Sequence, residues 1–150
     1  MRIALWLHIL ATVIWVGGMF FAHVALRPVV VTLPPPVRFP LVTATLATFF
    51  RWVATAVVTI VVSGFMMIFA KGGFAVVGAH VLVMTALGLV MASIYGFIVA
   101  VPFPRARAAV ASGAWETAGP ALIQVRRLVG VNLVLGLVTL TVAILGHDVV

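Results

Sequence analysis

The distribution of charged residues along this chain constrains its fold most strongly. Four long runs contain no Asp, Glu, Lys or Arg, at residues 3–26, 52–70, 72–104 and 128–147. Each run is close to or longer than the ~20 residues that an α-helix needs to cross a ~30 Å hydrocarbon layer. The runs are continuously apolar rather than alternating, so they predict membrane-spanning helices instead of the strands of a barrel.

Composition agrees with a membrane protein. Hydrophobic residues make up 65% of the 150 residues and charged residues only 7%, whereas a soluble domain carries roughly 25% charged residues. We therefore predict one transmembrane domain over residues 1–150, an all-α, antiparallel bundle of four transmembrane helices. The expected helices cover about residues 3–26, 43–70, 74–101 and 126–147.

Proline and glycine set the expected connections. The stretch Leu33–Pro40 contains four prolines and is expected to be non-helical. Lys71-Gly72-Gly73 is expected to form a tight turn. Residues 105–125 are expected to form the longest loop, with a short surface helix starting near residues 112–116.

The basic residues predict the orientation in the membrane. The larger group surrounds the first and third connections and comprises Arg27, Arg38, Arg51, Arg105, Arg107, Arg126 and Arg127, whereas only Arg2 and Lys71 lie on the other side. The positive-inside rule then places residues 27–51 and 105–127 in the cytoplasm and both termini in the periplasm of a bacterial inner membrane. The net charge of +7 therefore reflects topology and attraction to the lipid bilayer, and no nucleic-acid partner is expected. Homo-oligomerisation is left open.

Small residues on the helices predict where helices pack closely. Gly18 belongs to a line of small residues at seven-residue spacing on the first helix, and Gly88 to a line at four-residue spacing on the third. Both glycines are expected at helix–helix contacts, because small residues let two helices approach.

The histidines carry most of the chemical information. His8, His80 and His147 are predicted within a few turns of the periplasmic face, and His23 near the cytoplasmic end of the first helix. An ionisable side chain within a span usually faces the bundle interior or an aqueous cavity. We therefore expect His8 and His80 to face each other as the core of a metal or haem site, with a group such as Thr12 or a carbonyl holding the other nitrogen of each ring. The alternative for each histidine is an interfacial position with water, a carbonyl or a headgroup as partner.

Two kinds of centre fit such a pair of histidines. The first is copper, bound by imidazoles and by the soft thioethers of methionine. The candidate ligands are His8, His80, His147, Met66, Met67 and Met84. Adjacent residues differ by about 100° around a helix, so Met66 and Met67 cannot both point into one site.

The second kind of centre is a haem b with His8 and His80 as axial ligands. Arg2 and Lys71 lie on the same side and could contact its propionates. Catalytic residues are unknown and enzymatic activity is left open; an enzyme would be a haem b-dependent membrane oxidoreductase.

Missing residue types exclude other functions. None of the four uncharged runs contains Asp or Glu, which argues against a proton-coupled exporter. The chain has no cysteine, so neither a disulfide framework nor a thiolate metal site can form.

Several motifs resemble those of a known family. Residues 6–11 (WLHILA) and 14–21 (IWVGGMFF) are similar to the first helix of the copper resistance D (CopD) family. The small members of that family also show motifs like Leu26-Arg27-Pro28, Phe49-Phe50-Arg51-Trp52 and Arg126-Arg127-Leu128-Val129 with Asn132. The resemblance implies copper handling or transport across the inner membrane.

A more distant resemblance concerns the spacing of His8, Trp15 and Gly18. It is similar to the spacing in HemJ, a four-helix protoporphyrinogen oxidase family associated with haem b. This resemblance implies a haem b-binding bundle, either an electron-transfer protein or an oxidoreductase, as the alternative to copper.

Overall fold

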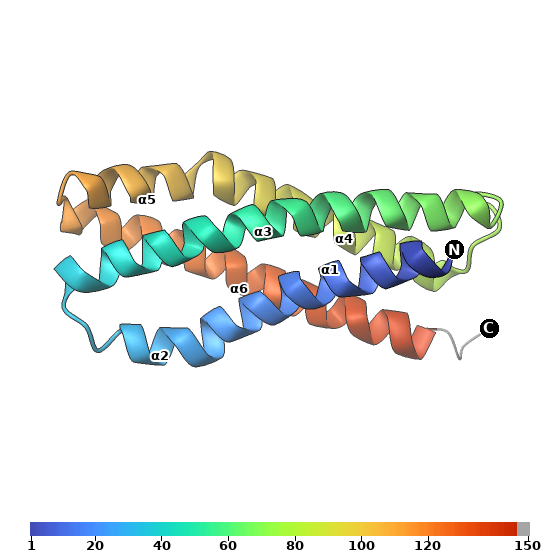
Figure 1. Ribbon diagram of the computed structural model, residues 1–150, viewed down its shortest axis with the longest axis horizontal. Coiled ribbons are helices and arrows are strands. Elements are labelled where there is room, and N and C mark those ends of the chain that lie inside the picture. The colour runs from blue at the N-terminus through green and yellow to red at the C-terminus, as the bar shows by residue number, and fades with distance from the viewer. Residues whose placement is uncertain (147–150) are drawn as a thin grey trace.

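The computed structural model describes residues 1–146, which form an all-helical, antiparallel bundle without strands (Figure 1). The chain crosses the length of the bundle in four helical segments. The elements are α1 (Arg2–Phe21), the π-helix η1 (Ala22–Leu26), α2 (Arg27–Val30), α3 (Pro35–Ala70), α4 (Ala79–Ala100), α5 (Pro102–Ala111) and α6 (Trp115–Leu145).

Four helical segments in the described part of the chain are long and apolar enough to cross a membrane. They are Arg2–Val30, Pro35–Ala70, Ala79–Ala111 and Trp115–Leu145. The prediction of four such helices is confirmed. Each segment is nevertheless longer than expected at the arginine-rich end of the bundle, on the left in Figure 1.

The prediction that the proline-rich stretch is non-helical is wrong beyond Pro34. Pro34 is the extended N-cap of α3, with ψ of 151°, and Pro35 and Pro36 occupy its first turn. The first backbone N–H groups of a helix have no acceptor within it, so proline loses nothing at these positions. Only Pro40 lies inside the helix. The first segment likewise continues past Arg27-Pro28 to Val30, through the π-helical turn.

The expected loop at residues 105–125 is also wrong, because most of it is helical. A kink at Val101 separates α4 from α5, and α5 and α6 are joined by a turn at residues 112–114. Gly113 has a φ of 69°, and the N–H of Ala114 donates to the carbonyl oxygen of Ala109 at 2.9 Å. This Schellman motif reverses the chain in very few residues.

The expected tight turn after α3 is confirmed, although α4 begins later than predicted. Gly72 and Gly73 have φ values of 109° and 93°, and the N–H of Gly73 donates to the carbonyl oxygen of Ile68 at 3.0 Å. Glycine is needed here because other residues rarely adopt these angles. The connection continues to Gly78, so α4 starts at Ala79 rather than near residue 74.

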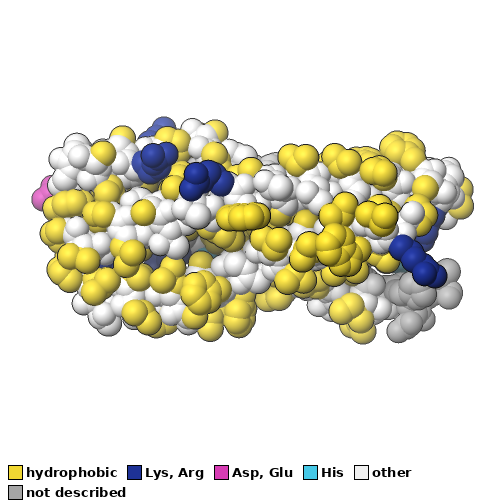
Figure 2. Space-filling view, viewed as in Figure 1, with side chains coloured by type: hydrophobic (Ala, Val, Ile, Leu, Met, Phe, Trp, Pro, Cys, Tyr) yellow, Lys and Arg dark blue, Asp and Glu magenta, His cyan; other side chains and the backbone are white. Residues whose placement is uncertain are grey.

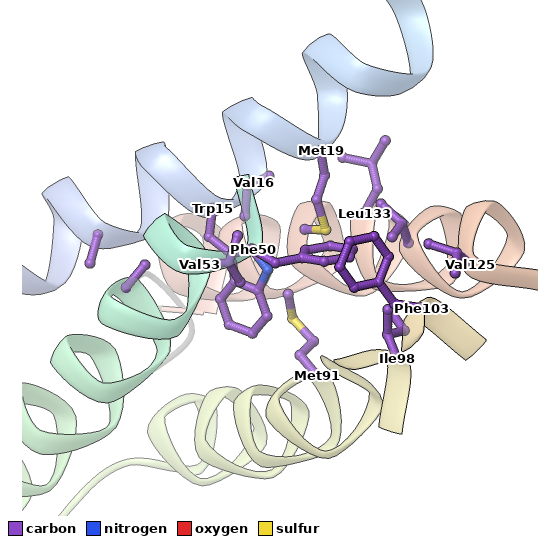
Figure 3. Close-up of a cluster of buried hydrophobic side chains, with 13 residues drawn as sticks. Trp15, Val16, Met19, Phe50, Val53, Met91, Ile98, Phe103, Val125 and Leu133 are labelled. Atoms are coloured by element: carbon purple, nitrogen blue, oxygen red, sulfur yellow. The ribbon is translucent and has the colours of Figure 1, made fainter. Parts of the chain in front are cut away.

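A buried core fills the middle of the bundle (Figure 3). Its central side chains include Trp15 and Met19 of α1, Phe50 of α3 and Met91 of α4. Two hydrogen bonds tie helices together around it. The Tyr95 hydroxyl donates to the Phe50 carbonyl oxygen at 2.7 Å, and the Asn132 side-chain amide donates to the Met91 carbonyl oxygen at 3.0 Å.

Only one of the two glycine predictions is confirmed. A Cβ on Gly18 would overlap the Phe49 ring of α3, so Gly18 lies at a close helix contact. Gly88 is not at such a contact, because a Cβ there would meet no atom within 4 Å. The contact on the other side of the bundle is made by Gly136, where a Cβ would lie 2.9 Å from Val16 and 3.2 Å from Met91.

The surface matches the sequence pattern of charge. On the face in Figure 2, Lys and Arg side chains lie in two groups toward opposite ends, with mainly hydrophobic side chains between them. Many large hydrophobic residues are exposed along the outside of the bundle. Such a surface is stable when lipid covers it.

Candidate metal-binding cavity

A cavity of about 400 Å³ lies at the Lys71 end of the bundle, lined by residues of α1, α3, α4 and α6. We call it the His8 cavity. Most of its lining is aliphatic or aromatic. The residues in its lining with polar, charged or thioether side chains are Met1, Arg2, His8, Thr12, Met67, Lys71, Met84, Thr85, Met91 and Thr139.

His8 is half-buried in this cavity, and its ring is held by Ser63 of α3. The His8 Nδ1 atom lies 2.9 Å from the Ser63 hydroxyl oxygen. That hydroxyl donates its one proton to the carbonyl oxygen of Thr59 on its own helix. It therefore accepts from Nδ1–H of His8, and this tautomer leaves a lone pair on Nε2 for a ligand.

The residues around the ring explain its position. A Cβ on Gly64 would lie 3.3 Å from His8 Cε1, so a glycine at this position leaves room for the imidazole beside α3. Thr12 does not hold the ring as predicted. Its hydroxyl donates to the His8 carbonyl oxygen at 2.8 Å and so bonds the backbone of α1.

The methionines divide as helical geometry requires. Met67 and Met84 line the His8 cavity, whereas Met66 is 58% exposed and is not part of its lining. Met91, which is 3% exposed, lines the inner part of the cavity. Met91 could not be selected from the sequence, because it lies two turns beyond Met84 in an apolar helix.

His80 lies at the start of α4, at the same end of the molecule. Its ring is packed against Gly78, where a Cβ would lie 2.9 Å from Cε1 and Nδ1, and its Cβ faces Gly146. His80 is not among the described residues that line the His8 cavity. The pairing of His8 with His80 thus stays a prediction, and His147 lies outside the described residues.

The arrangement gives no support for haem b between His8 and His80. A haem with two axial histidines needs both imidazoles in the same cavity, and among residues 1–146 His8 is the one histidine in the lining of this cavity. Arg2 and Lys71, the expected partners of the propionates, do line the cavity and are exposed.

A metal ion in this cavity would depend on thioether ligands. Within residues 1–146, no group of three or more His, Cys, Asp or Glu side chains could hold a metal ion. One imidazole with several methionines is a soft ligand set, which suits Cu(I) better than a hard cation such as Mg²⁺.

His23, which the sequence left without a role, lies in a second cavity of about 300 Å³. We call it the His23 cavity; it is lined by residues of η1, α2, α3 and α6, including Arg27, Arg38 and Arg126. The π-helical turn that carries His23 was not predicted, because its residues also fit an ordinary helix.

Comparison with known proteins places the chain in a family. The model of the family described as copper resistance protein D matches residues 43–145, more than half of the chain. The chain belongs to the copper resistance D family. In this family member the matched region runs from α3 to the end of α6, and α1 with His8 precedes it.

The family and the four long apolar helices together indicate a multi-pass membrane protein related to copper resistance. No curated protein and no solved structure matches the chain significantly. The more distant resemblance to HemJ stays a prediction.

Proposed function

We propose that this family member handles copper in the membrane, and that the His8 cavity binds Cu(I) as cargo. The ligands in this proposal are the Nε2 atom of His8 and the thioether sulfurs of Met67 and Met84. The observation that carries it is that these three side chains, from three different helices, line one cavity.

The state of His8 supports this proposal. Ser63 accepts a hydrogen bond from Nδ1–H, so in its neutral form the ring keeps Nε2 as the atom that can bind a metal. A hydrogen bond of this kind on the distal nitrogen orients a metal-binding histidine and raises its basicity as a ligand. Met91, at the inner end of the same cavity, adds a further soft donor.

The charge distribution supports an orientation for the site. The arginine-rich end of the bundle is proposed to face the cytoplasm, because basic residues of short loops are retained there. The His8 cavity, at the Lys71 end, then opens toward the periplasm of a bacterial inner membrane. Copper would enter it from outside the cytoplasm.

Cu(I) binding to the purified protein tests the proposal. The protein would compete for Cu(I) with a chelator whose copper complex is coloured. We expect it to withdraw one Cu(I) per chain from this chelator. Replacing Met67 by leucine should weaken this binding by about tenfold. This is the size of the loss in metal affinity when one group that supports a metal site is removed. Leucine keeps the volume of methionine and removes only the sulfur.

Met66→Leu is the matched control, because Met66 is the neighbouring residue and lies outside the cavity lining. Its copper affinity should equal that of the unaltered protein. Equal losses for both variants, or no copper binding by the unaltered protein, would overturn the proposal. His80→Ala tests the pairing separately: a loss as large as that of His8→Ala would make His80 a second imidazole ligand.

A further inference from the structure

The His23 cavity lies at the opposite end of the bundle from the proposed copper site. Its walls come from the end of the first segment, from α3 and from the first half of α6. In Figure 1, this end is on the left, where the α2–α3 and α5–α6 connections lie and where α2 diverges from α6. Arg27, Val31, Ile123 and Arg126 are exposed members of the lining, so they form the rim of the cavity.

The charges in this cavity are all of one sign. Its lining contains Arg27, Arg38 and Arg126 and no carboxylate. Glu116 is the only acidic residue within residues 1–146, and it is not part of the lining. Guanidinium groups gathered without a carboxylate attract an anion, and they pair particularly well with phosphate oxygens.

Arg38 differs from the other two arginines. It donates a hydrogen bond to the Val31 carbonyl oxygen at 3.3 Å, and its guanidinium carbon lies 4.8 Å from the centre of the Phe39 ring. These contacts hold it against the loop between α2 and α3. Arg27 and Arg126 are therefore the arginines best able to move toward a ligand at the rim.

His23 adds a polar group inside the cavity. Its Nδ1 atom is buried and has no hydrogen-bond partner among the described residues. A Cβ on Gly130 would lie 3.1 Å from the Nε2 atom, so this glycine allows the ring to pack against α6. A buried polar atom without a partner is costly, and a rotation of the ring that turned Nδ1 toward the cavity would let a ligand oxygen satisfy it.

The position of the cavity relative to the membrane identifies the kind of anion. Counting about 20 residues inward from the Lys71 end reaches Ala22 in the first segment and Arg126 in α6. The arginines of the rim thus lie at the level of the lipid headgroups. The rest of the lining is mainly aliphatic, with Leu26, Val30, Val42, Leu46, Leu122, Val125 and Val129. Such walls suit a ligand that carries hydrocarbon next to its charge.

We propose that the His23 cavity is a binding site for an anionic phospholipid. The phosphate lies at the rim between Arg27 and Arg126, the His23 imidazole contacts an oxygen of the glycerol or headgroup, and the aliphatic walls contact the adjoining methylenes. This site is independent of copper binding in the His8 cavity. It ties the first segment to α6 at an end where α2 and α6 diverge.

Lipid titration of the delipidated, detergent-purified protein tests this site. Native mass spectrometry would count bound phosphatidylglycerol and, in a parallel series, the neutral phosphatidylcholine. We expect one tightly retained phosphatidylglycerol per chain and much weaker retention of phosphatidylcholine. The double variant Arg27→Gln with Arg126→Gln should weaken phosphatidylglycerol binding by about tenfold or more, because each arginine near the membrane surface adds to the attraction for an anionic lipid.

The matched control is the double variant Arg105→Gln with Arg107→Gln. It removes the same charge from α5, at the same end of the molecule and outside the lining of the cavity. We expect its affinity to change by less than about twofold, the effect of general charge alone. Circular dichroism melting would confirm that both variants are folded. If the variant of the two rim arginines does not fold, the variant His23→Leu is used in its place. It should weaken binding of phosphatidylglycerol while leaving all the arginines in place.

Three outcomes would overturn the proposal. Equal losses in the two double variants would show attraction by net charge only, and equal retention of phosphatidylcholine would show no recognition of the phosphate's charge. Displacement of phosphatidylglycerol by millimolar glycerol 3-phosphate would show that the cavity takes a soluble phosphate rather than a lipid.

Discussion

The two cavities of this bundle have opposite chemistry, although the first segment, α3 and α6 contribute to both. The His8 cavity joins one imidazole to several thioethers, and its two cationic residues, Arg2 and Lys71, are exposed. The His23 cavity joins one imidazole to three arginines and contains no methionine. A histidine alone therefore does not define a metal site in this protein; the residues that surround it decide which ligand suits it.

The core separates the two cavities. Trp15 and Met91 belong to the core and line the inner end of the His8 cavity, while Val125 and Val129 belong to the core and line the His23 cavity. Figure 3 shows these core side chains packed together between the helices. Movement of copper from one end to the other would require these side chains to separate, so the described conformation is closed in its middle.

The largest expected difference between the two ends of the bundle is their accessibility to a membrane-impermeant reagent, because they are predicted to lie on opposite sides of the membrane. The chain has no cysteine, so single introduced cysteines can be labelled without background. A cysteine at Ala75, in the exposed turn before α4, should react with a membrane-impermeant maleimide in intact cells. A cysteine at Ser112, in the exposed turn after α5, should react only after the cells are opened.

Ala75 suits this experiment better than Gly72, whose φ of 109° would strain any other residue. Reaction of the cysteine at residue 112 in intact cells would reverse the orientation and place the His8 cavity on the cytoplasmic side.

The second prediction compares the two histidines directly. His8→Ala should weaken Cu(I) binding by about 100-fold, because it removes the one imidazole that the described residues contribute to the lining of the His8 cavity. His23→Ala should leave Cu(I) affinity unchanged, since its cavity holds arginines and no thioether. Chelator competition on both variants provides the measurement. A loss of copper affinity in the His23 variant would mean that the two cavities share one metal path.

The third prediction compares two glycines that looked alike in the sequence. Gly18→Leu should lower the free energy of unfolding by about 1–3 kcal/mol, because the added side chain would overlap Phe49. Gly88→Leu should change it by less than about 0.5 kcal/mol, because nothing lies within 4 Å of a Cβ there.

Gly88 lines the His8 cavity, so the leucine should instead reduce copper binding. Thermal melting in detergent and copper titration separate the two effects. A strongly destabilised Gly88→Leu protein that binds copper normally would contradict this view of the cavity.

The smallest effect is expected from the residue that orients His8. Ser63→Ala removes the acceptor of the Nδ1–H group and should weaken Cu(I) binding by about tenfold. Ser93→Ala is the control, because the Ser93 hydroxyl is exposed and donates only to the Leu89 carbonyl oxygen of its own helix. If the two variants bind copper equally well, Ser63 does not set the tautomer of His8.

The sequence predicted the four spans well, because uncharged runs of this length have few alternatives in structure. It failed at the arginine-rich end of the bundle. Pro35 and Pro36 look like helix breakers but begin α3, where the first turn needs no acceptor for its N–H groups. Residues 105–125 look like a loop but are mostly helical, because Ala106, Ala118 and Leu122 pack in a small buried cluster with Phe39.

Three residues of the predicted metal site, His8, Met67 and Met84, line one cavity, and their role as ligands stays a prediction. Ser63 was not selected, because a serine 55 residues away from His8 gives no signal in a single sequence. The arginines of the His23 cavity were read only as markers of topology. Their convergence depends on the π-helical turn and on the extension of α3 and α6.

X-ray absorption at the copper edge of the Cu(I)-loaded protein reports the ligand atoms of the metal. We expect a coordination shell of mixed nitrogen and sulfur, from one imidazole and from thioether sulfurs. The sulfur contribution should fall in Met67→Leu and Met84→Leu, whereas Met66→Leu should leave the spectrum unchanged. A coordination shell of nitrogen and oxygen alone, unaltered by these substitutions, would contradict a soft copper site in the His8 cavity.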